Sequence, residues 1–246
     1  YLLIMRLGID VGGTFTDFVL LDDASGQVKT YKCLTTPHDP SDAMEEGIRG
    51  LEKQAPDYLK QLGEIIHGTT LVINAIIERK GARTGLITTQ GFRDVLELGR
   101  EIRYAPYDVF AQVPEPLVPR HRRLEVNERL RADGSVLTQL DEADAREQVN
   151  ALKAMNVESV AVCLLNSFEN PAHELALKKI ICEEFPSASV SISYEVLPQI
   201  REYERTSTTV TNAYVKPLTE KYLRRLYERL SVLGFHGRLF IMLSSG

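Results

Sequence analysis

A dense group of glycine, threonine and aspartate residues near the start of the chain has the composition of a phosphate-binding turn. The nine residues IDVGGTFTD (9–17) lie between two apolar runs. Paired glycines at a strand–turn–strand let backbone N–H groups point into one concavity, which suits an anion such as phosphate. Hydroxyl groups would add donors, and a carboxylate could hold Mg²⁺ against the phosphates, directly or through water. We therefore expect Asp10 to be a catalytic residue and metal ligand, and the phosphate ligands to be Gly12, Gly13, Thr14 and Thr16.

The spacing of this turn differs from that of two common nucleotide-binding loops and of a plain hairpin. The P-loop needs G-x-x-x-x-G-K-[ST] followed by a helix, whereas Gly12 and Gly13 are followed by Thr-Phe-Thr and an expected strand. The dinucleotide fingerprint G-x-G-x-x-G is also absent from this stretch. A plain hairpin needs only one glycine and a polar neighbour. Two threonines and two aspartates exceed that need and favour phosphate binding.

A second polar group lies at residues 67–70, His-Gly-Thr-Thr, where an expected strand ends and a helix begins. Thr69, Thr70 and the free N–H groups of the helix could receive an anion. His67 could act as an acid or base near neutral pH. Asn74 lies one turn after Thr70 and faces the same way. The alternative is that Thr69 only caps the helix and that His67 is a packed residue at a strand end.

A third polar group is REYERTST, residues 201–208. On a helix Arg201 and Arg205 share one face, which suits a clamp for carboxylate or phosphate, and Glu202 could orient one arginine or serve as a base. The alternative is a solvated helix with i,i+4 ion pairs. The candidate catalytic residues are thus Asp10, His67, Glu202 and Arg205, and the candidate substrate-binding residues are Asn74, Arg93, Asp94, Arg201 and Asn212.

The first ninety residues are predicted to form the order β-β-β-α-β-α-β. Three strands in residues 1–36 form an antiparallel meander with turns at Gly12-Gly13 and at 24–26. The remaining predicted elements are a helix opened by Pro40 and Ser41, a strand at 64–67, a helix at 71–80 ended by Gly81, and a strand at 83–89.

The second half alternates strands and helices, which predicts a mostly parallel sheet covered by helices. Residues 101–120 are expected to be an extended connection, and Pro217 is expected to end or kink a helix from Arg201 to about Leu233. The other predicted elements are a hairpin over 121–140, a helix from Asp141 to Met155, a strand at 159–165, a helix at 170–185 and strands at 189–195 and 238–245. We divide the chain into a phosphate-loop subdomain (1–100), an insertion (101–135) and an α/β segment (136–246). The apolar strand running into Ser-Ser-Gly suggests that the polypeptide continues beyond residue 246; the alternative is that this strand simply closes the sheet.

The amino-acid composition limits the classes of molecule that the protein is expected to bind. The 246 residues are 43% hydrophobic with a net charge of −5, and the basic residues are dispersed or matched by glutamate. Nucleic acid is therefore not an expected partner. The apolar runs fall short of the roughly 18 residues of a membrane span. Cys33, Cys163 and Cys182 are widely spaced and odd in number, which argues against a disulfide framework or zinc site. We expect a cytoplasmic protein.

Several ordered blocks resemble the hydantoinase A and 5-oxoprolinase family, within the actin, sugar-kinase and Hsp70 ATPase superfamily. The turn IDVGGTFTD is similar to the first phosphate loop of that superfamily. The ending IMLSSG is similar to the family's I-M-x-S-x-G-G turn, cut before its second glycine. The other blocks are HGTTLVINAIIERKGARTGLITTQGFRDVLELGR (67–100), LEV and DG within 124–134, VCLLNSFENPAHE (162–174) and IREYERTSTTVTNAYVKP (200–217).

The resemblance implies a fold, an activity and partners. The fold is the N-terminal half of an α/β, actin-like (ribonuclease H-like) ATPase, with a mixed sheet and helices on both faces. The activity is ATP- and Mg²⁺-dependent hydrolysis of a cyclic amide of the hydantoin, N-methylhydantoin or 5-oxoproline type. The partners are a lactam or imide substrate and a hydantoinase B-type companion subunit in an oligomer. In that fold adenosine would bind between two halves, of which this chain is the first. The chain by itself is therefore expected not to hydrolyse ATP.

Two further functions are compatible with the resemblance. The same domain could phosphorylate an enolate as a subunit of an acetone- or acetophenone-type ketone carboxylase. It could also be a non-catalytic assembly subunit, although the intact residues of the phosphate turn argue against this. A sugar kinase is the least favoured alternative, because that function does not account for the REYERTST and HGTT blocks.

Overall fold

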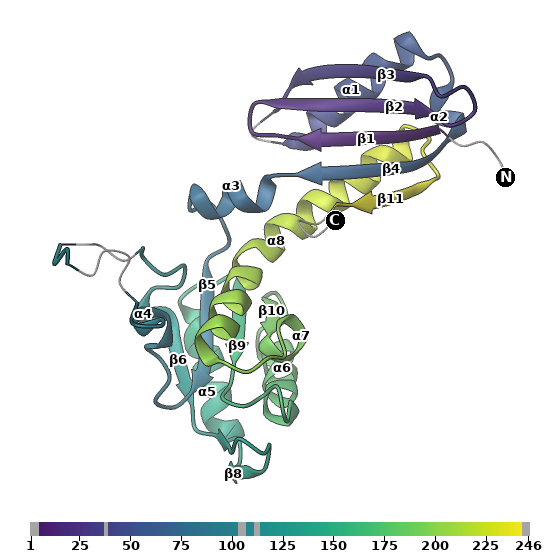
Figure 1. Ribbon diagram of the computed structural model, residues 1–246. Coiled ribbons are helices and arrows are strands. Elements are labelled where there is room, and N and C mark those ends of the chain that lie inside the picture. The colour runs from purple at the N-terminus through teal and green to yellow at the C-terminus, as the bar shows by residue number, and fades with distance from the viewer. Residues whose placement is uncertain (1–4, 37–38, 103–106, 111–113, 243–246) are drawn as a thin grey trace. The chain divides into compact units, whose positions relative to one another are not determined.

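The computed structural model describes residues 5–36, 39–102, 107–110 and 114–242 (Figure 1). The chain forms two compact units. The first contains the residues up to Lys80 together with those from Leu218 onward, and the second runs from Gly81 to Pro217. The chain passes from one unit to the other after Lys80, and again within helix α8 (Glu202–Val232).

The first unit is built on a mixed sheet of five strands in the order β11-β4-β1-β2-β3. The three N-terminal strands form the expected antiparallel meander, and β4 and β11 add to it in parallel. Because β1 and β4 are parallel neighbours, their carboxyl ends meet at the same edge of the sheet. The strands are β1 (Met5–Val11), β2 (Phe15–Asp22), β3 (Val28–Leu34), β4 (Leu62–Thr69) and β11 (Arg238–Ile241).

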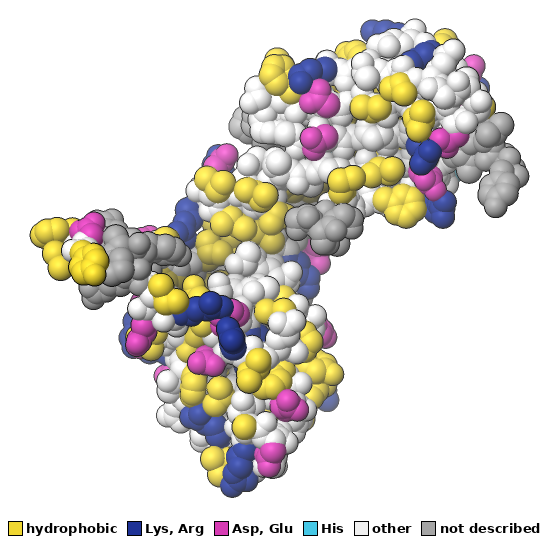
Figure 2. All heavy atoms as spheres, in the orientation of Figure 1, with side chains coloured by type: hydrophobic (Ala, Val, Ile, Leu, Met, Phe, Trp, Pro, Cys, Tyr) yellow, Lys and Arg dark blue, Asp and Glu magenta, His cyan; other side chains and the backbone are white. Residues whose placement is uncertain are grey.

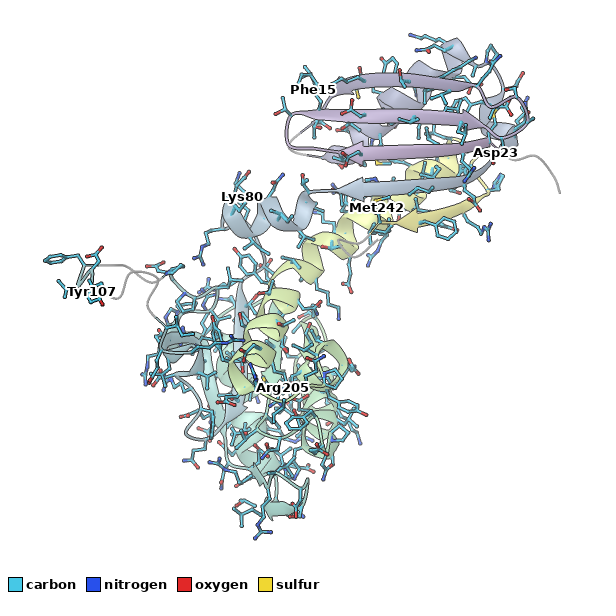
Figure 3. The ribbon with its side chains drawn as sticks, viewed as in Figure 1. Phe15, Asp23, Lys80, Tyr107, Arg205 and Met242 are labelled. Carbon is cyan, nitrogen blue, oxygen red and sulfur yellow. The ribbon has the colours of Figure 1, made fainter. Side chains whose placement is uncertain are left out.

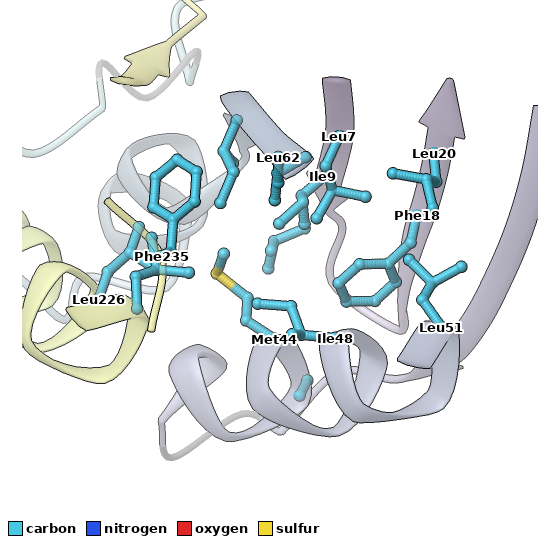
Figure 4. Close-up of a cluster of buried hydrophobic side chains, with 14 of the residues drawn as sticks. Leu7, Ile9, Phe18, Leu20, Met44, Ile48, Leu51, Leu62, Leu226 and Phe235 are labelled. Atoms are coloured by element: carbon cyan, nitrogen blue, oxygen red, sulfur yellow. The ribbon is translucent and has the colours of Figure 1, made fainter. Parts of the chain in front are cut away.

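Three short helices and the end of α8 complete the first unit. They are α1 (Pro40–Gln54), α2 (Tyr58–Gln61) and α3 (Leu71–Ile77). Asp39 caps α1 by accepting a hydrogen bond from the Ser41 backbone N–H at 3.1 Å, and Pro40 occupies the first turn. The core lies between α1, α8 and one face of the sheet (Figure 4), and includes Leu7, Ile9, Phe18, Met44, Ile48, Leu51 and Leu226.

Helix α1 approaches the sheet very closely at two glycines. A Cβ atom at Gly47 would lie 2.0 Å from Cζ of Phe18, and one at Gly50 would lie 2.4 Å from Cζ of Tyr31. Both positions therefore exclude a side chain unless an aromatic ring moves. The opposite face of the sheet carries partly exposed apolar residues, among them Phe15, Val19 and Leu34. Apolar side chains are visible over this unit in Figure 2.

The second unit contains a four-stranded parallel sheet in the order β10-β9-β5-β6. Helices α5 (Glu142–Ala154) and α6 (Ala172–Glu184) pack on one face through Val149, Leu177 and their neighbours. Val210 and Ala213 of α8 pack on the other face, against Ala161 and Cys163. The strands are β5 (Thr84–Thr89), β6 (Arg123–Val126), β9 (Ser159–Cys163) and β10 (Ser189–Ile192). Smaller elements are α4 (Val95–Leu98), η1 (Arg120–Arg122), β7 (Arg129–Leu130), β8 (Val136–Thr138) and α7 (Ser193–Val196).

The expected helices on both faces of a sheet are thus present in the second unit. In the first unit, α1, α2 and the end of α8 pack on one face of the mixed sheet. Within the described residues, no helix combines the length and apolarity needed to cross a membrane.

Several element predictions need correction. The strand at 84–89 does not belong with the first subdomain, because β5 pairs with β6 and β9. The compact units therefore divide the chain at Lys80 and Pro217, which differs from the predicted division at residues 100 and 135. The predicted hairpin is limited to β7 and β8, since Arg123–Val126 joins the parallel sheet. Ser193–Val196 is helical and does not extend the preceding strand.

Helix α8 continues through Pro217, where an end or kink was expected. Proline removes one backbone donor and its ring crowds the preceding turn. Here the helix is held on both sides of the proline by buried residues, Val210 and Ala213 in the second unit and Tyr222 and Leu226 in the first. Packing has therefore outweighed the local preference. The predicted last strand is present as β11 as far as Ile241; the Ser-Ser-Gly turn lies outside the described residues.

Candidate functional site

Gly12 and Gly13 of the glycine turn line a cavity at the carboxyl ends of β1 and β4, whereas Asp10, Thr14 and Thr16 are not among its lining residues. The cavity has a volume of about 360 Å³. In α/β sheets such ends, where a strand leads into a turn or helix, are the usual place for ligands. Figure 3 shows Phe15 at the turn end of β2 and Lys80 beyond the end of α3. The lining includes Gly12, Gly13, Thr35, Thr70, Asn74 and Lys80.

The glycine turn offers fewer free backbone N–H groups than a full anion-binding nest would. The Gly12 N–H donates to the Phe15 carbonyl at 3.0 Å, which closes the turn. A Cβ at Gly12 would lie 3.1 Å from that carbonyl oxygen, whereas Gly13 is exposed and its Cβ would lie 3.8 Å from Nδ2 of Asn74. Gly12 therefore has a role within the turn. The donors that the turn offers to an anion are those of Gly13 and Thr14.

The two threonines of the turn differ in access. Thr14 is exposed and Thr16 is fully buried. The hydroxyl oxygen of Thr16 lies 2.9 Å from that of Thr35. The expectation that Thr16 binds a phosphate directly does not agree with this burial, because strand alternation turns Thr16 inward. Thr35, which was not among the candidate residues, contacts the turn through its hydroxyl.

The second polar group forms the other wall of the cavity. Thr70 donates its backbone N–H to the Val11 carbonyl at 3.2 Å, which joins the start of α3 to the end of β1. Asn74 Nδ2 donates to Thr70 Oγ1 at 3.2 Å, as their i,i+4 spacing indicated. Thr69 Oγ1 accepts from the Leu71 N–H at 3.2 Å, but the N-cap position of α3 is occupied by Thr70 and not by Thr69, which was the alternative expected for Thr69.

Asp10 lies at the end of β1, in register with Gly68 on β4 and Asp17 on β2. Its side chain is exposed. A Cβ at Gly68 would lie 3.2 Å from Oδ1 of Asp10, so the absence of a side chain there leaves room beside the carboxylate. Asp17 instead pairs with Lys32 at 3.0 Å. A single accessible carboxylate with open space fits Mg²⁺ that is also bound by phosphate oxygens.

The structure places His67 in the core and not at the cavity. Its side chain is fully buried, and Nε2 lies 2.8 Å from the hydroxyl of Tyr222. Burial lowers the pKa of His67 to about 4. The imidazole is therefore neutral at pH 7, and the geometry agrees with the alternative of a packed residue at the end of a strand.

The expected arginine clamp is not formed. Helix α8 begins at Glu202, and Arg201 precedes it with a φ of 87°, so the two arginines do not share a helical face. Arg205 is buried, donates to the Leu164 carbonyl and lies 3.4 Å from Cys163 Sγ (Figure 3). Its guanidinium also lies over the Phe168 ring at 5.2 Å. Arg205 therefore anchors α8 to the second unit, while Glu202 stays exposed.

The remaining candidates also lie in the second unit and have local partners. Asp94 accepts two hydrogen bonds from Arg120, at 2.8 and 3.0 Å, and these hold the pKa of the carboxyl below its usual range. Arg93 donates to the Arg120 carbonyl at 3.4 Å. Asn212 donates to Ser191 Oγ at 2.9 Å. Their role in substrate binding stays a prediction.

Three polar lining residues, Thr35, Glu78 and Lys80, were missed from the sequence. Thr35 follows a strand whose neighbour carries the glycine turn, and an antiparallel meander brings the end of its third strand beside its first turn. That topology is a signal which could have identified it. Lys80 forms an ion pair with Glu78 at 2.6 Å, and both line the cavity. Among the described residues, no three His, Cys, Asp or Glu side chains are grouped to hold a metal without help from another ligand.

The mixed sheet, the helix-covered parallel sheet and the turn at the strand ends define an α/β protein of the actin-like class. The chain belongs to the hydantoinase/oxoprolinase family, whose N-terminal region matches residues 6–185. The resemblance and the fold class expected from the sequence are both confirmed.

Two similar proteins and one solved structure show how far the likeness extends. The caprolactamase subunit alpha of Pseudomonas jessenii is 38% identical over 235 residues, 93% of this chain and 34% of that protein. The acetophenone carboxylase gamma subunit of Aromatoleum aromaticum is 36% identical over 260 residues, 99% of this chain and 35% of that protein. The crystal structure of the ATP-dependent caprolactamase from P. jessenii matches with a TM-score of 0.89 at 36% identity, covering 96% of this chain and 35% of that one. The chain thus spans about a third of the length of these relatives.

Proposed function

We propose that this chain is the nucleotide-binding N-terminal portion of an ATP-dependent hydrolase that acts on cyclic amides of the hydantoin or 5-oxoproline type. The observation that carries the proposal is the cavity in which the glycine turn faces the start of α3. The likeness to a caprolactamase subunit and to an ATP-dependent caprolactamase structure supports both the ATP dependence and the amide class.

The proposed chemistry explains the residues present. An unstrained cyclic amide is a poor electrophile, and ATP supplies a phosphoryl group that activates its carbonyl oxygen while Mg²⁺ neutralises phosphate charge. The backbone N–H groups of Gly13 and Thr14 would donate to phosphate oxygens, and Asp10 would hold the metal beside Gly68. Thr70 and Asn74 shape the opposite wall. These groups would position the phosphates and neutralise their charge, which are the main contributions of a protein to phosphoryl transfer.

The alternative is a subunit of an ATP-dependent ketone carboxylase, in which the same cavity would serve to phosphorylate an enolate. It is favoured by the 36% identity to the acetophenone carboxylase gamma subunit, which covers 99% of this chain. The glycine turn serves either reaction, because both begin with transfer of a phosphoryl group to an oxygen atom.

We also propose that the protein acts in the cytoplasm, in an oligomer with a hydantoinase B-type companion subunit. The naming of two relatives as alpha and gamma subunits supports a multi-subunit assembly. Cys33 and Cys163 are free and buried in the structure, and thiols of this kind suit a reducing compartment.

The test is release of ADP by the full-length protein assembled with its companion subunit. We expect release to depend on a cyclic amide when 5-oxoproline, hydantoin and caprolactam are supplied in turn. Dependence on a ketone with bicarbonate would replace this proposal by the carboxylase alternative. ATP binding without turnover under any of these conditions would instead favour a non-catalytic assembly subunit.

A matched pair of variants tests the assignment of the cavity. Asp10→Asn should lower turnover by a factor on the order of 10² or more, since it removes the proposed metal ligand. The control Asp23→Asn alters a carboxylate at the other end of the β1–β2 hairpin, where it pairs with Arg6, and should retain turnover. Equal turnover in the two variants would remove Asp10 and the glycine turn from the site.

A further inference from the structure

Thr35, immediately after β3, makes three contacts with the glycine turn. Its backbone N–H donates to the Thr14 carbonyl at 2.9 Å. Its hydroxyl donates to the Gly12 carbonyl at 2.9 Å and lies 2.9 Å from the hydroxyl of Thr16. Thr35 is half-buried and itself lines the cavity. One residue from a different strand therefore contacts both ends of the turn.

The proton count assigns the direction of these bonds. A threonine hydroxyl has one proton, and that of Thr35 is directed to the Gly12 carbonyl. In the pair of hydroxyl groups, Thr16 must therefore be the donor and Thr35 the acceptor. The Thr16 hydroxyl thus donates its proton to Thr35 and not to a ligand, and its side chain is fully buried. Thr16 consequently acts on the turn through Thr35.

The planarity of the peptide bond makes the Gly12 contact important. In a trans peptide the C=O of one residue and the N–H of the next point in opposite directions. When the Gly12 carbonyl is held toward Thr35, the N–H of Gly13 is held pointing away from Thr35. A glycine turn has little intrinsic preference for one backbone conformation, so an external contact is needed to fix this direction.

We propose that Thr35 is a positioning residue of the phosphate-binding turn, and that it sets the direction of the Gly13 N–H through its bond to the Gly12 carbonyl. The inference rests on the proposed function, because it assigns that N–H to a phosphate oxygen of the nucleotide. It identifies the third strand of the meander as part of the nucleotide site. It also gives a role to the pair of threonines at 16 and 35, whose hydroxyl oxygens lie 2.9 Å apart.

The test compares two replacements of the same residue in the full-length protein. Thr35→Val keeps the shape and the backbone N–H but removes the hydroxyl, whereas Thr35→Ser retains the hydroxyl. We expect Thr35→Val to weaken binding of MgATP by about tenfold or more, and Thr35→Ser to bind within about threefold of the original protein. Thr30→Val, at an exposed position of the preceding strand β3, is the matched control and should leave affinity unchanged.

A second measurement separates positioning from general loss of structure. Hydrogen exchange of the Gly12 amide, which donates to the Phe15 carbonyl and is followed without nucleotide, should accelerate in Thr35→Val and not in Thr35→Ser or Thr30→Val. If the original protein binds MgATP and Thr35→Val binds it equally well, the positioning role is overturned and the proposed function stands. If the original protein binds no MgATP, the proposed function fails. In that case unchanged Gly12 exchange in Thr35→Val would overturn the positioning role as well.

Discussion

His67 on β4 and Tyr222 on α8 are joined by a buried hydrogen bond of 2.8 Å between Nε2 and the phenolic oxygen. The two residues are 155 positions apart in the sequence. Tyr222 also lies 3.3 Å from Met44 Sδ on α1. This contact attaches the last part of the long helix to the first sheet, beneath the strand end that carries Thr69. It therefore supports the cavity from within the core.

Replacing Tyr222 by phenylalanine should destabilise the first unit. The ring would still fill its space, but the buried Nε2 of His67 would lose its partner, which costs about 1–3 kcal/mol. The measurement is urea denaturation at pH 7. Tyr227→Phe, on an exposed tyrosine of the same helix, is the control and should change stability by less than about 0.5 kcal/mol. A Tyr222→Phe variant as stable as this control would show that the bond contributes nothing.

Stability should fall as the pH is lowered from about 6.5 to about 4. The ordinary pKa of histidine is near 6.5, and burial lowers that of His67 to about 4. Within this window the unfolded chain binds a proton that the folded protein does not, so acid favours unfolding. The loss between pH 7.5 and pH 5 should be about 2 kcal/mol.

The His67→Gln variant isolates this contribution from the other titrating groups. Denaturation midpoints are measured for both proteins at a series of pH values. The original protein should lose more stability than the variant across the window, because glutamine does not titrate. Parallel curves for the two proteins would contradict the assignment.

Gly47→Ala should destabilise the protein although alanine is the better helix former. The new Cβ would lie 2.0 Å from Phe18, so the ring or the helix must shift. Overpacking of a core costs about 1–3 kcal/mol, which exceeds the roughly 1 kcal/mol gained in helix propensity. Thermal unfolding would show a lowered midpoint. Glu46→Ala, at the neighbouring exposed position, should leave it nearly unchanged; a stabilised Gly47→Ala would mean that the helix does not approach Phe18 this closely.

Much of the fold follows from local signals. The meander of β1, β2 and β3 could be predicted because alternating apolar residues and two turn signals act within a few positions of each other. The helix that starts at Asp141 was predicted for the same reason, and Asp141 caps α5 by accepting from the N–H groups of Ala143 and Asp144. The glycine turn and the Thr70–Asn74 pair were also identified from spacing alone.

The errors concern residues whose surroundings come from distant parts of the chain. REYERTST has the same composition whether Arg205 is exposed or lies against Leu164 and Cys163, some forty residues earlier. His67 could be an acid–base group or a core residue until Tyr222 is brought beside it. The segment 123–126 could be half of a hairpin until β5 provides a parallel partner.

The sequence by itself was sufficient to establish the family, the α/β class and a phosphate-type turn, because these depend on residue types at fixed short spacings. The tertiary structure was needed to distinguish Thr14, which is exposed, from Thr16, which is buried, and to bring Thr35 to the turn. It was also needed to carry α8 through Pro217 into the first unit. The physical reason is the same in each case: burial, pairing and pKa depend on neighbours that only the packed chain supplies.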